Sequence, residues 1–249
     1  MPMTFPRMFP IRQVFPDVCL KDPVAAAREA VLASRLGSRI SKGCRVAVTA
    51  GSRGINQIPG ITRAVVDAVR ALDGEPFVVP AMGSHGGATA DGQVGVLASY
   101  GITEASMGCP IESTMDVVQV GEVEEGIPVV LNRLATEADA IVLINRIKPH
   151  TAFHGPFESG LMKMMTIGLG SHRGATLAHS MGAAALPRMI PAWGRVILDR
   201  APIALGIAIV ENAYEHTARV TAVEPEDFET VEPTLLDEAR ALMPRLPVD

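Results

Sequence analysis

Histidines are concentrated in one glycine-rich stretch of the sequence. Four of the six lie between positions 150 and 179, namely His150, His154, His172 and His179. Histidine exchanges protons near neutral pH and, when neutral, offers a nitrogen ligand to metal ions. Because the stretch follows the apolar run Ala140–Ile144, it predicts a long functional loop at a strand end, followed by a helix.

His172 and His179 are seven residues apart. If Ser171 caps a helix that runs through Met181, both side chains lie on one face of that helix. The pair could then share a metal ion. The interpretation that we favour makes only one of them a ligand, while the other packs or contacts an anion.

Two glycine-rich loops each follow an apolar run. Gly51-Ser52-Arg53-Gly54 comes after Arg45–Thr49, and Gly83-Ser84-His85-Gly86-Gly87 comes after Phe77–Ala81. Glycines let backbone N–H groups approach an anion closely, and Arg53 could hold a carboxylate or phosphate with two hydrogen bonds. In open parallel sheets ligands bind at such strand ends, which favours a role for His85. A simple turn and a surface arginine remain the alternatives.

Lys163 stands in the apolar context Gly160-Leu-Met-Lys-Met-Met165. Loss of water around a lysine lowers its pKa and makes the amine nucleophilic, although the side chain could instead extend to solvent. Three carboxylates, Glu112, Asp116 and Glu158, are further candidates, but solvated or capping roles are favoured for them.

Several sequence patterns are missing. There is no GxSxG, HExxH, Walker A or complete GxGxxG motif, which argues against a hydrolase elbow, a zinc protease, a P-loop protein and a simple dinucleotide-binding domain. The three cysteines, Cys19, Cys44 and Cys109, form no CxxC pair and are predicted to be buried, reduced thiols.

Composition limits the partners. Hydrophobic residues make up 48% of the 249 residues, enough for a large core. The net charge of −5 and the pI of about 5.7 argue against nucleic acid and against an anionic membrane surface. The sequence contains no run of 18 apolar residues and no recognisable signal peptide, so the cytoplasm is expected.

Strand–loop–helix patterns repeat along the chain, which predicts an α/β fold with an open, mainly parallel sheet and helices on both faces. A proline-rich arm over 1–22 should precede a single catalytic, cofactor-binding domain over 23–249. Strands are predicted at 45–49, 77–81, 129–132, 140–144, 203–210 and 217–222. Helices are predicted at 23–36 (capped by Asp22, ended by Gly37), 59–72, before Tyr100, at 186–199 with an interruption at Pro191, and at 233–243.

The motifs resemble those of the nickel-dependent lactate racemase family, in its N-terminal catalytic domain. Gly83-Ser84-His85, Pro149-His150, Lys163 and His179 occur in the order that the family shows, with the last two residues sixteen apart. The resemblance extends from about Val46 to the end of the chain.

The resemblance implies a nickel pincer nucleotide as cofactor and a 2-hydroxy acid as small-molecule substrate. Lys163 would tether the cofactor through a thioamide, and His179 would be a nickel ligand. His85 and His150 would be the two acid/base groups, one on each face of the substrate, and Arg53 would contact a phosphate or the substrate carboxylate. Further cofactor contacts are expected in the two glycine-rich loops, at Ser52, Gly83, Ser84 and Gly86. The implied activity is racemisation or epimerisation by hydride transfer.

Some positions differ from the family. Ala50 replaces an acid, Phe157–Met162 replaces a Gly-Gly pair before the lysine, and His154 is additional. These differences indicate a divergent branch whose hydroxy acid is larger or derived from a sugar. The family's C-terminal domain is not found in this sequence, so we expect an N-terminal catalytic domain, a truncated form or a chain that needs a partner, with a homo-oligomer as a further option. The alternatives are a non-catalytic cofactor-binding module and a zinc-dependent hydrolase or lyase that uses the histidine cluster.

Overall fold

A five-stranded sheet forms the centre of the computed structural model, which describes residues 8–123 and 126–245. The strand order is β2-β1-β5-β6-β7, in which the first four strands are parallel and β7 is antiparallel to β6. The α/β prediction is therefore confirmed. The strands are β1 (Arg45–Ala50), β2 (Glu75–Pro80), β5 (Ala140–Arg146), β6 (Ile203–Glu211) and β7 (Thr217–Val223).

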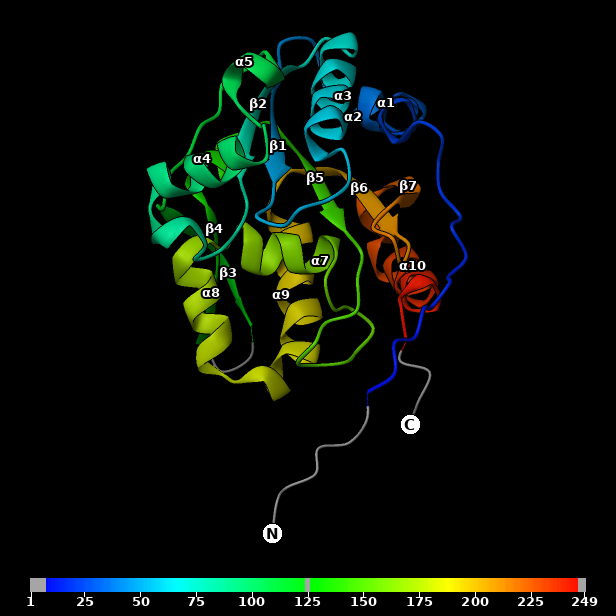
Figure 1. Cartoon of the computed structure of the whole chain (residues 1–249). Helices are drawn as coiled ribbons and strands as arrows, with labels where there is room; N and C mark the ends of the chain where they lie inside the picture. Colours follow the sequence, from blue (N-terminus) through cyan, green and yellow to red (C-terminus); the bar gives the residue numbers. More distant parts are fainter. Residues whose placement is uncertain (1–7, 124–125, 246–249) are drawn as a thin grey trace.

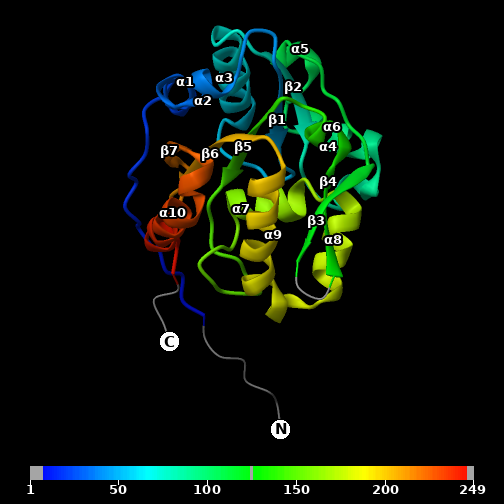
Figure 2. The same cartoon turned by 180° about the vertical axis from the view of Figure 1, so that it is seen from behind.

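Both faces of this sheet are covered (Figure 1 and Figure 2). Alternate residues of a strand point to opposite faces, so Val46 and Val48 pack into one core while Ala47 packs into the other. The first core includes α1 (Pro23–Ala33) and α3 (Ile58–Ala71), and the second includes α9 (Leu186–Arg200) and α10 (Phe228–Leu242). Further helices include α2 (Leu36–Arg39), α4 (Ala90–Ser99), α5 (Glu104–Met107) and α6 (Arg133–Thr136).

A separate two-stranded sheet packs with the second core. It pairs β3 (Val117–Val123) with β4 (Ile127–Asn132) in antiparallel register. Only β4 was predicted, and from a later start at Val129. β3 was missed because the region 102–127 around it is mixed and polar, although four of the seven residues of β3 are valines. β3 is half-buried along most of its length, and pairing with β4 and packing against α9 stabilise it together with the strand propensity of its valines.

The first helix is shorter than predicted. Asp22 caps it as expected and accepts a hydrogen bond from the Ala25 N–H at 2.9 Å. The helix ends at Ala33, however, because the Ser34 hydroxyl donates to the Val31 carbonyl at 2.6 Å and accepts from the Leu36 N–H at 3.2 Å. Gly37 therefore lies inside α2 and does not end the first helix.

Two prolines lie within helices. The predicted interruption at Pro191 is wrong, since α9 runs through it, and α10 begins at Phe228, before Pro233. Each proline removes one backbone donor. Burial of side chains such as Trp193 and Leu236 in the second core offsets that loss.

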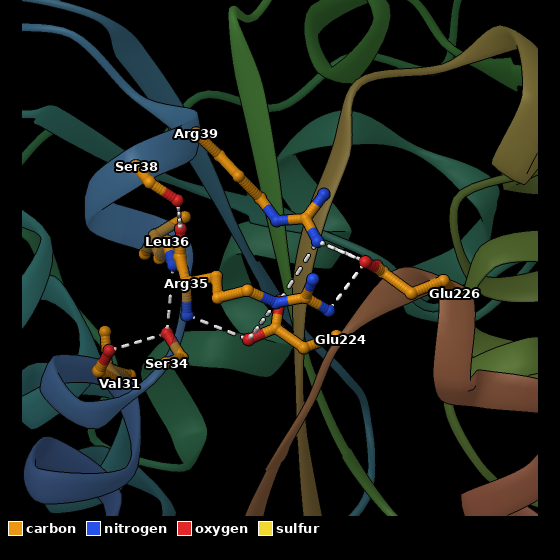
Figure 3. A network of polar contacts seen from close by, with 8 residues as sticks. All are labelled: Val31, Ser34, Arg35, Leu36, Ser38, Arg39, Glu224 and Glu226. Carbon is orange, nitrogen blue, oxygen red and sulfur yellow. Dashed lines mark hydrogen bonds and ion pairs between the residues drawn. The ribbon is translucent and has the colours of Figure 1, made fainter.

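Charged side chains join α2 to the segment after β7 (Figure 3). Arg35 Nη2 lies 2.6 Å from Glu226 Oε1, and Arg39 Nη2 lies 2.7 Å from Glu226 Oε2. Glu224 also contacts both arginines. Exposed ion pairs of this kind contribute about 0–1 kcal/mol each to the free energy of unfolding. The main effect of the network is therefore to orient α2.

The N-terminal arm forms no helix or strand in its described part, residues 8–22. It is attached to the β6–β7 turn, where Asn212 Nδ2 donates to Asp17 Oδ1 at 2.7 Å, and the Leu20 N–H donates to the Thr217 carbonyl at 2.8 Å. Among the described residues, no helix combines the length and the apolarity needed to cross a membrane.

Candidate active site

A cavity opens at the carboxyl edge of the sheet, where strand order reverses. From β1 the chain passes to β2 on one side and later to β5 on the other, so the loops after β1 and β5 diverge. The ladder between these strands ends at Val48 and Val142, beyond which the Thr49 hydroxyl accepts a hydrogen bond from the Ile144 N–H at 3.0 Å. Ligands of open α/β sheets bind at such a point.

The cavity has a volume of about 540 Å³. Eight of the nine predicted site residues line it: Ser52, Arg53, Gly83, Ser84, His85, His150, Lys163 and His179. Gly86 is the exception. It lies in a turn at φ +68°, where an added Cβ would be 2.6 Å from the Gln93 nitrogen, so it shapes the loop rather than the cavity wall.

His85 follows β2, and its Nδ1 is hydrogen-bonded to the Ser52 hydroxyl, which follows β1. Burial, followed by the charges of Arg53 and Lys163, lowers the pKa of His85. Gly83 has a φ of +61°, and its N–H donates to the Gly168 carbonyl at 3.1 Å. The two predicted loops and the segment after Lys163 are thus joined by hydrogen bonds.

His150 follows β5. Its ring stacks on Phe153 with 4.3 Å between the ring centroids, and its Nδ1 accepts a hydrogen bond from the Ala152 N–H at 3.1 Å. Nε2 is therefore the nitrogen left to exchange a proton. Burial is the largest cause that lowers the pKa of His150, and the charge of Lys163 adds to it.

Lys163 ends the short helix α7 (Leu161–Lys163), which continues as a π-helical turn over Met164–Gly168. α7 lies just beyond the ends of β1 and β5 (Figure 1). Burial, together with the charge of Arg53, lowers the pKa of Lys163 to about 8. Its Nζ lies 5.5 Å from the centre of the Phe153 ring. The expectation of a partly desolvated lysine is thus confirmed.

His179 lies in the last turn of α8 (Ser171–Ser180) and is exposed beside the cavity. His172, on the same helix, is exposed and does not line the cavity, so the two histidines are not brought to one site. His154 is also exposed, with Nδ1 3.5 Å from Glu158 Oε1. Only His150 and His179 of the histidine-rich stretch therefore reach the cavity.

The cavity wall is cationic. Besides Arg53 and Lys163, the wall includes Arg146 and Lys148, which were not predicted although they flank Ile147 at the end of β5. No aspartate or glutamate is among the lining residues. Of the four cations, Arg146 is paired with Glu211, and among the described residues the other three have no carboxylate within 4 Å. In a protein of net charge −5, this wall indicates an anionic ligand.

The three candidate carboxylates lie outside the cavity wall. Glu112 pairs with Arg45 at 2.6 Å, and Asp116 is exposed, 3.7 Å from Arg133. Glu158, by contrast, is fully buried beside the His150 loop, so the expectation of a solvated or capping carboxylate was wrong as to solvation, although its carboxylate does accept backbone N–H groups.

A second group of metal-ligating types, Asp17, Cys19 and His216, lies at the surface beside the arm. His216 Nδ1 and Asp17 Oδ1 are 2.8 Å apart and form a hydrogen bond that attaches the arm. Cys19 is exposed and Cys44 is half-buried, so the prediction of buried cysteines is right only for Cys109.

The fold and the site define an α/β domain with a cationic, histidine-containing cavity at the switch point of its sheet. The chain belongs to the family described as the lactate racemase N-terminal domain, which matches residues 38–188. Its structure is similar to that of the lactate racemase apoprotein from Thermoanaerobacterium thermosaccharolyticum, with a TM-score of 0.65 and 16% sequence identity. The match covers 91% of this chain and 60% of that chain, so this chain spans less than two thirds of the enzyme. Comparison with curated proteins gives no match.

Proposed function

We propose that the chain is the catalytic domain of a racemase or epimerase that acts on a 2-hydroxy acid with a nickel pincer nucleotide. One observation carries the proposal: two histidines of lowered pKa, a lysine with a pKa of about 8 and a third histidine line one cationic cavity. They come from four separate segments of the chain, and all of them lie within residues 38–188, the range that matches the lactate racemase N-terminal domain.

The residues present fit this cofactor. Lys163 is half-buried, and at pH 8 about half of its amine is neutral and able to form a covalent link. His179 offers an imidazole to nickel at the cavity edge. Arg53 and Lys148 offer charge to a phosphate. When bound, this cofactor supplies the group that takes the hydride from C2 of the substrate and returns it.

The histidines handle the hydroxyl proton. Their pKa values are lowered, so both are neutral near pH 7. Neutral His85 can accept the proton of the substrate hydroxyl at Nε2 while its Nδ1–H donates to Ser52, whereas His150, whose Nδ1 accepts from the Ala152 N–H, presents its proton at Nε2. They follow β2 and β5, which lie on opposite sides of β1. Arg53 follows β1 between them, where it can hold the substrate carboxylate in the middle of the cavity. Neutral His85 thus takes the proton and becomes an imidazolium, and a protonated His150 gives its Nε2 proton to the carbonyl oxygen when the flat 2-keto acid is reduced from its second face. Proton exchange with water returns both rings to their starting forms.

The substrate is a 2-hydroxy acid larger than lactate, for which sugar acids are the first class to examine. Ala50, which stands where the family carries an acid, is part of the cavity wall, so no carboxylate repels the substrate there. The uncharged lining includes Asn145, Thr151 and Ser159, whose polar groups can bind further hydroxyls.

The test begins with the chain expressed together with the enzymes of cofactor synthesis. We expect a mass increase on Lys163, bound nickel, and inversion of at least one member of a 2-hydroxy-acid panel that includes sugar acids, followed by chiral chromatography. The Lys163→Met variant should lose the mass increase and the activity, whereas Lys148→Met should keep the mass increase. Each of His85→Ala and His150→Ala should keep the adduct and lose inversion.

The outcomes separate the alternatives. Absence of both the adduct and nickel under these conditions contradicts the proposal. An adduct without inversion of any panel member identifies a non-catalytic cofactor-binding module. Activity with zinc alone that survives Lys163→Met identifies a metal-dependent hydrolase or lyase.

A further inference from the structure

The loop that carries His150 is closed at its base. It connects β5 to α7, and a backbone pair joins its ends: the Lys148 N–H donates to Ser159 O at 2.8 Å, and the Ser159 N–H donates to Lys148 O at 3.1 Å. The residues between have no helix or strand to satisfy their N–H groups. Such groups need other partners where they turn away from water.

Glu158 is that partner. Its side chain is 0% exposed, and Oε2 accepts a hydrogen bond from the backbone N–H of His150 itself. Oε1 accepts from the Gly155 N–H at 3.2 Å. Burial raises the pKa of Glu158, but these hydrogen bonds and that of Arg240 outweigh it, so the pKa is lowered and the carboxylate is charged.

The positive charge that compensates Glu158 comes from α10. Arg240 Nη2 donates to Glu158 Oε1 at 2.6 Å and to the Gly155 carbonyl at 3.1 Å. Arg240 is itself oriented by Asp237, one turn earlier on α10, at 2.7 Å. A residue of α10 thus fixes a loop carboxylate that lies 82 positions earlier in the chain.

We propose that Glu158 is a positioning residue for His150 and that Arg240 holds Glu158 in place. Glu158 does not line the cavity, so it acts on the substrate only through His150. The contact at the His150 N–H places the backbone, while Phe153 and the Ala152 N–H set the ring, and together they leave Nε2 for the substrate. This inference rests on the proposed acid/base role of His150.

His154 does not account for the burial of Glu158. Its imidazole is 79% exposed and 3.5 Å from the carboxylate, beyond normal hydrogen-bond distance. The donors within hydrogen-bond distance are the two loop N–H groups and Arg240. The Glu158 carboxylate therefore binds the backbone of the loop and does not bind the exposed side chain of His154.

The test compares Glu158→Gln and Arg240→Lys with Glu229→Gln. Glu229 is also on α10, but it pairs with Arg195 on α9, away from the loop. In the cofactor-loaded protein we expect Glu158→Gln to lower kcat by about 10- to 100-fold, since a displacement of ~1 Å costs about that much. The KM, the Lys163 adduct and the nickel content should stay near wild type. Arg240→Lys should lower kcat less, and Glu229→Gln should not change it.

A second readout is independent of activity. Nitrogen NMR of the protein without cofactor should find the neutral His150 ring protonated on Nε2, and Glu158→Gln should give a mixture of tautomers. The pKa of His150 should also fall, because the charge of Glu158 raises it.

Unchanged kcat and unchanged His150 signals in Glu158→Gln overturn the proposal, as does a parallel loss of fold, adduct and activity in both variants. If the wild-type protein inverts no substrate, the proposed function fails, and the His150 signals alone decide whether Glu158 positions this residue.

Discussion

The pKa values of single residues in the cavity depend on burial and on the charges of neighbouring residues. The side chain of Lys163 is half-buried and lies near the charge of Arg53. Both effects disfavour the ammonium form of the lysine. Burial, and then the charges of Arg53 and Lys163, lower the pKa values of His85 and His150, which keeps both imidazoles neutral near pH 7. The site is thus prepared for a covalent link and for proton transfer before any anion binds.

The pKa of about 8 for Lys163 predicts selective reactivity. Near pH 8, reductive methylation or acylation should modify Lys163 faster than Lys21 or Lys42, because neutral amines are the reacting form. Peptide mass spectrometry across a pH series measures the midpoint for each lysine. Arg53→Gln should move the midpoint of Lys163 to higher pH, since the charge of Arg53 lowers it. A midpoint of Lys163 equal to those of the other lysines would refute this prediction.

At the scale of the secondary-structure elements, the Thr49 side chain joins β1 to β5 at the point where these strands separate beside the cavity. Its hydroxyl is fully buried and accepts from the Ile144 N–H at 3.0 Å. Thr49→Val leaves that N–H unpaired, so the free energy of unfolding should fall by about 1–3 kcal/mol. Thr62 in α3 is the matched control: it is equally buried, and its hydroxyl has no partner among the described residues. Urea unfolding should therefore find Thr62→Val neutral or stabilising, and equal losses in the two variants would contradict the assignment.

Glu232 connects α10 to the helix that carries Lys163. Its Oε2 accepts from the Met162 N–H at 3.0 Å, Oε1 has no partner among the described residues, and burial raises the pKa to about 7 from 4.5. The folded state therefore binds more protons than the unfolded state between these pH values. The stability that the protonated carboxyl contributes is fully present below pH 4.5 and is lost as pH rises to about 7.

Comparison with Glu232→Gln isolates this effect. Between pH 4.5 and 7, the free energy of unfolding of the wild type should fall relative to that of the variant by roughly 3 kcal/mol. Urea unfolding at a series of pH values measures the difference. Parallel pH curves for the two proteins would show that Glu232 does not titrate in this range.

At the scale of the whole molecule, charge is unevenly distributed. The chain carries a net charge of −5, yet its cavity wall contains four cations and no carboxylate. The positive charge of the wall therefore attracts an anion to the cavity, where the ends of the strands, the loops and α7 meet. The arm and the Arg35–Glu226 network lie away from this cavity and involve other elements.

This distribution predicts salt-dependent binding of anions. Nicotinic acid mononucleotide serves as a phosphate-bearing probe, and its Kd by calorimetry should rise severalfold as salt screens the wall. Arg53→Gln should weaken binding and flatten the salt dependence. Arg195→Gln removes an equal charge outside the cavity and should change neither. A Kd that does not change with salt concentration would contradict an electrostatic role for the cavity wall.

The sequence by itself determined the local features of this protein. Apolar, β-branched runs gave the strands of the parallel sheet, and Asp22-Pro23 gave the start of α1. The order of His85, His150, Lys163 and His179 in the sequence by itself indicated the family that the match over residues 38–188 shows. These signals are short in range, because side-chain periodicity and capping depend on neighbours a few positions away.

Only the tertiary structure decided which groups meet. The pairing of Glu158 with Arg240 spans 82 residues, and that of Arg146 with Glu211 spans 65, so neither leaves a local pattern. Likewise, the first turn of α10 is stabilised by packing of Phe228 in the core, which no short window of sequence contains. Long-range contacts pair these carboxylates with arginines, and no carboxylate lines the cavity, which leaves the cavity wall positively charged. Tertiary packing also buries Lys163 beside Arg53 and so lowers the pKa of its amine.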